Sequence, residues 1–119
     1  MESFESSLKR KVKRGEIAIF DVFNAESGES RVEYLDGVEI RDMLVEPNSE
    51  RLSDLLAIYD GYGVDIDEDH YKLIAGAPLI SYLIQETAIF IRESVLETPE
   101  VDKQRVEEFL AERKESENR

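Results

Sequence analysis

The stretch EIAIFDVF, residues 16–23, is the most informative part of the sequence for the fold. Its apolar residues follow one another almost without interruption, and most are β-branched or aromatic: Ile17, Ala18, Ile19, Phe20, Val22 and Phe23. Such a run is too short and too continuous for a surface helix, whereas it suits a strand. Residues 16–23 are therefore predicted to form a buried β-strand.

Two further strands are predicted downstream. A turn-rich cluster separates the first strand from residues 31–35, in which polar and apolar side chains alternate. Asp36-Gly37 is a favourable hairpin turn, and two apolar residues follow it at alternate positions, Val38 and Ile40. We expect residues 31–40 to form two strands of a short antiparallel β-meander, with Asp36-Gly37 as the turn.

Apolar residues recur at helical spacing in four other segments, at about residues 3–14, 49–59, 78–96 and 101–111. The third segment begins with Pro78 in its first turn and carries apolar residues around most of its circumference. Because such a helix lacks a wide polar face, we expect it to be buried centrally or shared with a second subunit. Residues 60–71 are expected to form a loop.

The predicted fold is a single α+β domain over residues 1–119, in which a short antiparallel β-meander packs against helices, including one long buried apolar helix. Residues 1–14 are expected to form a basic N-terminal helix, and residues 112–119 a polar tail that frays. A chain of 119 residues suits one domain, since about two thirds of its unfolded surface can be buried on folding.

The charge balance restricts the partners of the chain. Its 28 Asp and Glu against 15 Lys and Arg give a net charge of −13, and residues 1–14 alone carry +3, which leaves −16 for the rest. A body this acidic lacks the basic footprint that phosphate recognition needs, so we expect no nucleic-acid partner. Cations and basic proteins are the expected partners.

The residue types that are missing narrow the chemistry. The sequence has no cysteine, which excludes disulfide scaffolds, thiolate metal sites and cysteine nucleophiles, and His70 is its single histidine. An enzyme would have to rely on carboxylate or metal-assisted chemistry, and we expect the chain not to be an enzyme. There is no apolar run of about 18 residues and no signal-peptide pattern, which predicts a cytoplasmic protein without a membrane partner.

The densest polar cluster lies at residues 60–70, DGYGVDIDEDH. Five carboxylates fall within ten residues, with no Lys or Arg among them: Asp60, Asp65, Asp67, Glu68 and Asp69. Crowded carboxylates repel one another, and a hard divalent cation relieves that repulsion by binding them. Calcium suits such a site because it takes about six to eight oxygen ligands in adaptable geometry. The loop is predicted to bind Ca²⁺, and a solvated acidic loop without a ligand is the alternative.

The spacing of this loop differs from that of an EF-hand. Asp65, Asp67 and Asp69 match the first, third and fifth ligands of the EF-hand loop. His70 stands where the sharp-turn glycine belongs, and Gly76 stands where the bidentate glutamate belongs. A calcium site here would therefore be of a non-EF-hand type.

Three other polar features have both a functional and a structural interpretation. Asp36, with Glu39 three residues later, could hold a second cation loosely, although its place in an Asp-Gly turn explains it equally well. His70 could act as a general base or a metal ligand, but we expect it to be the surface partner of an aspartate. Glu86 and Glu93 share a helix face, where we expect them to mark a polar stripe and not a catalytic pair.

Several features together resemble a known family: the small size, the absence of cysteine, the apolar helix, the Asp36-Gly37 turn and the acidic loop DGYGVDIDED at residues 60–69. This family is the small acidic calcium-binding proteins of filamentous cyanobacteria, the CcbP-like family linked to heterocyst differentiation. The resemblance implies a cytoplasmic, regulatory calcium buffer without an EF-hand. It also implies one or two stronger sites and several weak ones on an acidic surface.

The function predicted from the sequence is reversible calcium binding and sequestration. Its candidate ligands are Asp36, Asp60, Asp65, Asp67, Glu68 and Asp69. The alternative is an acidic protein-interaction module, such as an adaptor, an inhibitor or a nucleic-acid mimic, that binds a basic regulatory protein. Either function is compatible with a homodimer.

Overall fold

A computed structural model describes residues 3–44, 51–94 and 100–117 of the chain. Over these residues, helices and strands follow one another in the order α1 (Phe4–Lys13), β1 (Ile17–Asn24), β2 (Ser30–Asp36), α2 (Gly37–Leu44), α3 (Arg51–Tyr59), β3 (Val64–Ile66), β4 (Asp69–Ala75), α4 (Ala77–Glu93) and α5 (Glu100–Glu117). The α+β class predicted from the sequence is confirmed. Helix α1 also lies where a basic N-terminal helix was expected.

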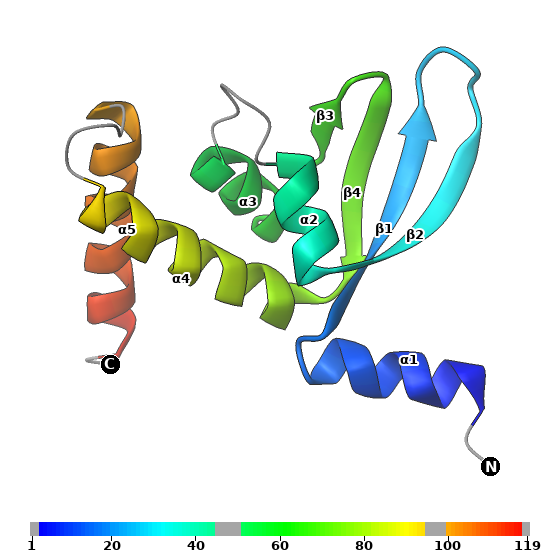
Figure 1. Cartoon of the computed structure of the whole chain (residues 1–119), viewed down its shortest axis with the longest axis horizontal. Coiled ribbons are helices and arrows are strands. Elements are labelled where there is room, and N and C mark those ends of the chain that lie inside the picture. Colours follow the sequence, from blue (N-terminus) through cyan, green and yellow to red (C-terminus); the bar gives the residue numbers. More distant parts are fainter. Residues whose placement is uncertain (1–2, 45–50, 95–99, 118–119) are drawn as a thin grey trace.

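The four strands form one antiparallel sheet in the order β2-β1-β4-β3. The stretch that the sequence marked as a buried strand is the inner strand β1, which pairs with β2 from Ile17↔Asp36 to Phe23↔Ser30. On its other side β1 pairs with β4, and the register shifts at a bulge between Ile19 and Phe20. The sheet therefore consists of two hairpins, β1–β2 and β3–β4, joined along β1 and β4 (Figure 1).

One face of the sheet carries the hydrophobic core. Ala18, Phe20 and Val22 of β1 are fully buried there, and the Phe20 ring meets the Tyr71 ring edge to face at 6.0 Å between centroids. Helices α2, α3 and α4 lie on this side, with α5 beyond α4 (Figure 1). They contribute most of the remaining buried apolar side chains: Ile40, Leu44, Leu52, Leu55, Ile58, Leu79, Ile80, Leu83, Ile84, Ala88, Ile91 and Val106. We call this the helix face and the opposite one the open face.

The predicted meander is wrong after Asp36. Instead of turning into a third strand, the chain enters helix α2 at Gly37, and Ile40 and Leu44 become buried one helical turn apart. The backbone N–H of Glu39 donates to Asp36 Oδ1 at 2.9 Å, and the backbone N–H of Asp36 donates to Glu39 Oε1 at 3.2 Å. This reciprocal pair is a capping box, which favours a helix start over a hairpin turn.

The loop predicted for residues 60–71 is also wrong. Residues 64–66 and 69–75 form β3 and β4, which turn at Asp67 and Glu68. Val64 and Tyr71 pair across the hairpin, and each is only 8% exposed. Burial of these two apolar side chains on the helix face stabilises the two strands. The strands were not predicted because the many carboxylates nearby are typical of a loop.

Helix α4 is not buried all round, so the prediction of a long, centrally buried apolar helix does not hold for its described part. One side of α4 packs into the core through Leu79, Ile80, Leu83, Ile84, Ala88 and Ile91. The other side exposes Tyr82, Ile89 and Phe90. Residues 95–96, the end of the predicted helix, lie outside the described residues. Among the described helices, none has both the length and the apolar character needed to span a membrane.

Candidate functional site

The predicted calcium ligands are distributed over three parts of the molecule. Asp60 follows α3 and lines a groove toward α5, whereas Asp36 caps α2 at the other end of the sheet. The remaining four lie in the β3–β4 hairpin, at Asp65, Asp67, Glu68 and Asp69. Within residues 3–44, 51–94 and 100–117, no three His, Cys, Asp or Glu side chains converge on a position for one metal ion.

Asp69 lies on the helix face of β4 and is held by an ion pair. Arg31 of β2 donates from both terminal nitrogens, with 3.0 Å between Nη2 and Oδ2 and 3.4 Å between Nη1 and Oδ1. The amide of Asn24 donates to Oδ1 at 2.9 Å. These hydrogen bonds, that of Arg31 first, lower the pKa of Asp69 below its ordinary value. The guanidinium also donates from Nε to Glu33 at 2.7 Å, and its own pKa is raised. Asp69 is therefore already neutralised by the protein itself.

Asp65 and His70 face each other on the open side of the same hairpin. They are directly opposite in the β3–β4 register, and Asp65 Oδ1 lies 2.6 Å from His70 Nδ1. The expectation that His70 is the surface partner of an aspartate is confirmed. Gly63 makes room for the imidazole, because a Cβ at Gly63 would lie 2.1 Å from His70 Nε2. The arrangement positions the ring and occupies one carboxylate of the predicted calcium loop.

Glu68 meets Glu26 where the two hairpins end side by side. The backbone N–H of Ala25 donates to the Glu68 carbonyl at 3.0 Å, which ties the β1–β2 turn to the β3–β4 turn. The side-chain hydrogen bond with Glu26 raises the pKa of Glu68, and desolvation and the charges of Asp69 and Asp67 add to this effect. The two residues are 42 positions apart in the sequence, so local spacing does not indicate that they meet.

The open face of the sheet is a further candidate surface, which was not predicted from the sequence. Side chains at the outward positions of an antiparallel sheet are ordinarily polar. Here four large apolar side chains are 46–56% exposed: Phe23, Val32, Tyr34 and Ile74. Helix α1 adds Phe4, which is 72% exposed and contacts the Tyr34 ring edge to face at 6.5 Å. The sequence of β1 did contain an indication of this surface, because its apolar residues occupy both faces of the strand.

A shallow hollow of about 500 Å³ lies where α1 meets this open face. Its lining comes from Leu8, Val12, Ile19, Tyr34 and Ala75 together with the charged residues Glu5, Lys9 and Lys13 of α1. None of the side chains of α1 is buried, although the helix presents Phe4, Leu8 and Val12 along one side. The apolar side of α1 and the apolar side chains of the sheet thus form one continuous exposed surface.

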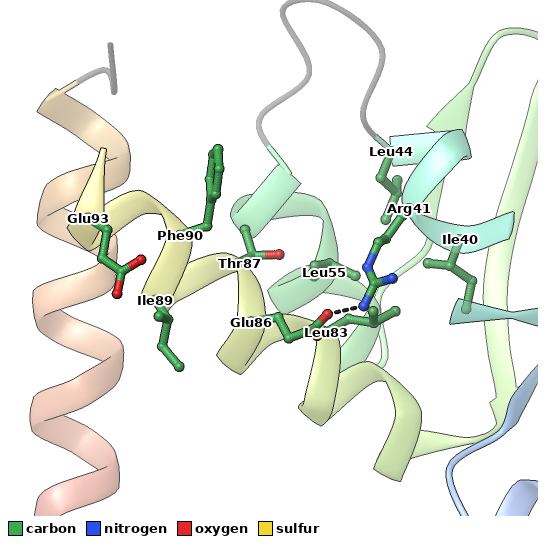
Figure 2. Close-up of a pocket in the computed structure, with 10 residues that line it drawn as sticks. All are labelled: Ile40, Arg41, Leu44, Leu55, Leu83, Glu86, Thr87, Ile89, Phe90 and Glu93. Carbon is green, nitrogen blue, oxygen red and sulfur yellow. Dashed lines mark hydrogen bonds and ion pairs between the residues drawn. The ribbon is translucent and has the colours of Figure 1, made fainter. Parts of the chain in front are cut away.

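A second groove, of about 520 Å³, lies between α2 and α4 (Figure 2). Its apolar lining comes from Ile40, Leu44, Leu55, Leu83, Ile89 and Phe90. Arg41 reaches across it to form an ion pair with Glu86, which also accepts a hydrogen bond from the Tyr82 hydroxyl at 2.7 Å. These bonds, Tyr82 first, lower the pKa of Glu86, and the same bond raises the pKa of Tyr82.

Glu86 and Glu93 both line the groove between α2 and α4, in agreement with their predicted common helix face. Within the described residues, the polar partners of Glu86 are structural: an arginine that bridges two helices and a tyrosine one turn earlier.

Comparison of the chain with protein-family models, with curated proteins and with solved structures gave no significant match.

Proposed function

We propose that the chain is a small protein-interaction domain that binds a partner protein through the open face of its sheet. The observation that carries this proposal is the exposure of Phe23, Val32, Tyr34 and Ile74 on one sheet face, continuous with Phe4 of α1. Contiguous exposed apolar surfaces of this kind mark binding sites in folded proteins. Their aromatic residues are among those enriched at interface hot spots.

The charge at the hairpin-turn end of this face favours a basic partner. At its α1 end the apolar surface borders Lys9 and Lys13, whereas at the opposite end it reaches the two hairpin turns, whose exposed acidic side chains are Glu26, Glu29, Asp67 and Glu68. Together with the net charge of −13, they produce a negative field that accelerates association with basic proteins and weakens as salt is added. The partner is therefore a protein that presents an apolar patch beside lysine and arginine side chains.

Site-specific photo-crosslinking in cells tests this proposal. A photoreactive residue replaces Ile74 on the open face, and the matched control replaces Glu107, which is exposed on α5. A specific partner is captured from position 74 only. When purified, it binds the wild-type chain in a salt-sensitive and calcium-independent manner, and Ile74→Glu weakens its binding at least tenfold. Equal capture from both positions, or binding unchanged by Ile74→Glu, would contradict the proposal.

Calcium buffering is the second candidate function, and the Glu26–Glu68 pair is the specific observation that favours it. Two carboxylates held close together repel each other, and a divalent cation that binds both relieves this repulsion. Asp67 is the neighbouring exposed carboxylate in the same turn, and the backbone carbonyls of the two turns supply further oxygens of the kind that calcium accepts. The site would be small, exposed and built from two hairpin turns.

Calorimetric titration of calcium into chelator-stripped protein, in physiological salt with millimolar magnesium, tests this second function. Saturable heat at about one or two sites that is weakened by Glu68→Gln, and by Asp65→Asn with Asp67→Asn, supports calcium buffering. Glu107→Gln is the matched control, because it removes one carboxylate elsewhere on the surface. The absence of saturable heat, or equal loss in the control, would leave protein binding as the function.

A further inference from the structure

Strand β2 has an unoccupied edge. It is the outermost strand in the order β2-β1-β4-β3, and among the described residues only β1 pairs with it. Its seven residues, SRVEYLD, contain no proline and no bulge, and the opposite edge strand β3 has only three residues. Exposed edges of this length are usually blunted, because they are templates for pairing with another chain.

The hydrogen-bond register identifies which backbone groups point outward from this edge. The N–H of Asn24 donates to the Glu29 carbonyl at 2.9 Å, so this pair is hydrogen-bonded. Hydrogen-bonded and non-hydrogen-bonded pairs alternate along an antiparallel ladder. Arg31 and Glu33 therefore bond inward to β1, whereas the N–H and C=O groups of Ser30, Val32 and Tyr34 point to the free edge.

We propose that this edge pairs antiparallel with the same edge of a second copy, with Val32 on the two-fold axis. Val32 then lies opposite Val32 of the other copy, and Ser30 lies opposite Tyr34. All three residues use the backbone groups that the fold leaves free. The pairing goes beyond the proposed partner binding and does not depend on it.

Charge complementarity selects this register among the alternatives. With Val32 on the axis, Arg31 of each copy lies opposite Glu33 of the other, at a non-hydrogen-bonded position where side chains are closest. With Glu33 on the axis, two carboxylates would oppose each other, which is unfavourable. Both side chains are partly exposed, at 44% for Arg31 and 28% for Glu33, and so can reach across the new pair.

The dimer extends the open face as well as the sheet. Val32 and Tyr34 point to the open face, so pairing places the exposed apolar surfaces of two copies next to each other. The result is one eight-stranded antiparallel sheet, because each copy supplies its four strands. A partner protein that binds the open face would meet a surface twice as wide.

Sedimentation analysis of the full chain over a wide concentration range is the first test. The wild type is expected to dimerise, and Val32→Pro, which removes an outward N–H without removing a bond to β1, is expected to weaken the dimer at least tenfold. Ile74→Glu is the matched control: it changes the open face and leaves the edge intact. A wild-type chain that stays monomeric at every concentration, or a dimer lost in Ile74→Glu but kept in Val32→Pro, would overturn the proposal.

Single cysteines test the register, and the absence of native cysteine gives a clean background. Residues on the two-fold axis have Cα atoms about 5.5 Å apart, within disulfide range. Oxidation is expected to cross-link Val32→Cys most efficiently, ahead of Glu33→Cys and Tyr34→Cys. A maximum at position 33 or 34 would overturn the register.

Charge exchange is an independent test of the same pairs. Glu33→Arg places two arginines opposite each other in its own dimer, and Arg31→Glu does the same with two glutamates, so each variant alone is expected to be monomeric. Mixing the two restores both opposite-charge pairs and is expected to yield a heterodimer. Circular dichroism checks that Arg31→Glu, which also loses its intrachain bonds to Asp69, remains folded. No association on mixing two folded variants would contradict the pairing.

Discussion

Asp36 and Glu39 cap helix α2 reciprocally: each side-chain carboxylate accepts a hydrogen bond from the backbone N–H of the other residue, at 2.9 and 3.2 Å. The pair satisfies backbone donors that the first turn of a helix leaves without an intrahelical partner. It also changes the direction of the chain from β2, at the sheet edge, into the helical layer. The Asp36 carboxylate is thus occupied by a structural role at the position where a cation had been considered.

Replacement of Asp36 by alanine is expected to lower the free energy of unfolding by about 1 kcal/mol, because one cap is lost. Asp36→Ser retains a capping oxygen and is expected to cost only a few tenths of a kcal/mol. Urea unfolding measures both values. If Asp36→Ser destabilises the protein as much as Asp36→Ala, the carboxylate charge and not the cap would be the important feature.

The prediction of the fold from the sequence succeeded where the apolar pattern was unambiguous and failed where two local structures compete. Residues 17–23 have a strand pattern on any interpretation, and they form the inner strand. Asp36-Gly37 supports both a hairpin turn and a helix start. Burial of Ile40 and Leu44 against α4 and the sheet decides in favour of the helix. That burial depends on packing between distant segments, which local spacing does not report.

The candidate site was only partly predictable for the same reason. The pairing of His70 with an aspartate follows from composition, since the histidine is surrounded by carboxylates. The contacts of Asp69 with Arg31 and of Glu68 with Glu26 join residues 38 and 42 positions apart, through the pairing of β1 with β4. The acidic loop seemed free to bind a cation because its neighbours in space were unknown.

Gly63 and His70 are coupled by a close approach that mutagenesis can measure. Gly63→Ala places a Cβ against the imidazole, so the ring must leave Asp65, and we expect a loss of about 1 kcal/mol. In a His70→Ala background the clash is absent. The same substitution is then expected to stabilise the protein by about 0.5 kcal/mol, because alanine restricts the unfolded chain. A thermodynamic cycle from urea unfolding checks this change of sign, and equal effects in both backgrounds would contradict it.

The Arg31–Asp69 ion pair predicts a specific pH dependence. The pKa of Asp69 is lowered in the folded state, mainly by its hydrogen bonds with Arg31. A lowered folded pKa contributes stability above the unfolded pKa, and that contribution is lost as the pH falls through the folded value. Asp69→Asn is therefore expected to destabilise the protein at pH 7 and to have a progressively smaller effect below about pH 4.

Unfolding measured from pH 7 to pH 2 checks this dependence, and NMR titration of the Asp69 carboxyl identifies its cause. Arg31→Gln is expected to raise the pKa of Asp69 toward its ordinary value, because the first of its hydrogen-bond donors loses its charge. A destabilisation by Asp69→Asn that is constant across this range would mean that the side chain contributes through packing or through the Asn24 hydrogen bond instead.

Gly76 connects β4 to α4 at a point where the backbone passes very close to β1. Its φ is 110°, and a Cβ there would lie 2.5 Å from the Ala18 Cα and 3.0 Å from the Ile17 carbonyl oxygen. Gly28 is the matched control, because its φ of 74° is also positive but a Cβ would meet nothing within 4 Å. Gly28→Ala is expected to cost about 1–2 kcal/mol, the strain of a left-handed backbone.

Gly76→Ala carries the same kind of strain and must also push the start of α4 away from the sheet. We expect about 1–3 kcal/mol of further destabilisation, which is typical of overpacking a buried contact. The core depends on this approach, since Leu79 and Ile80 follow within one turn and are both buried against the sheet layer. Urea unfolding of the two variants separates the contributions: equal losses would mean that backbone strain alone makes glycine necessary, and a larger loss at Gly76 would establish the close approach of α4 to β1 in solution.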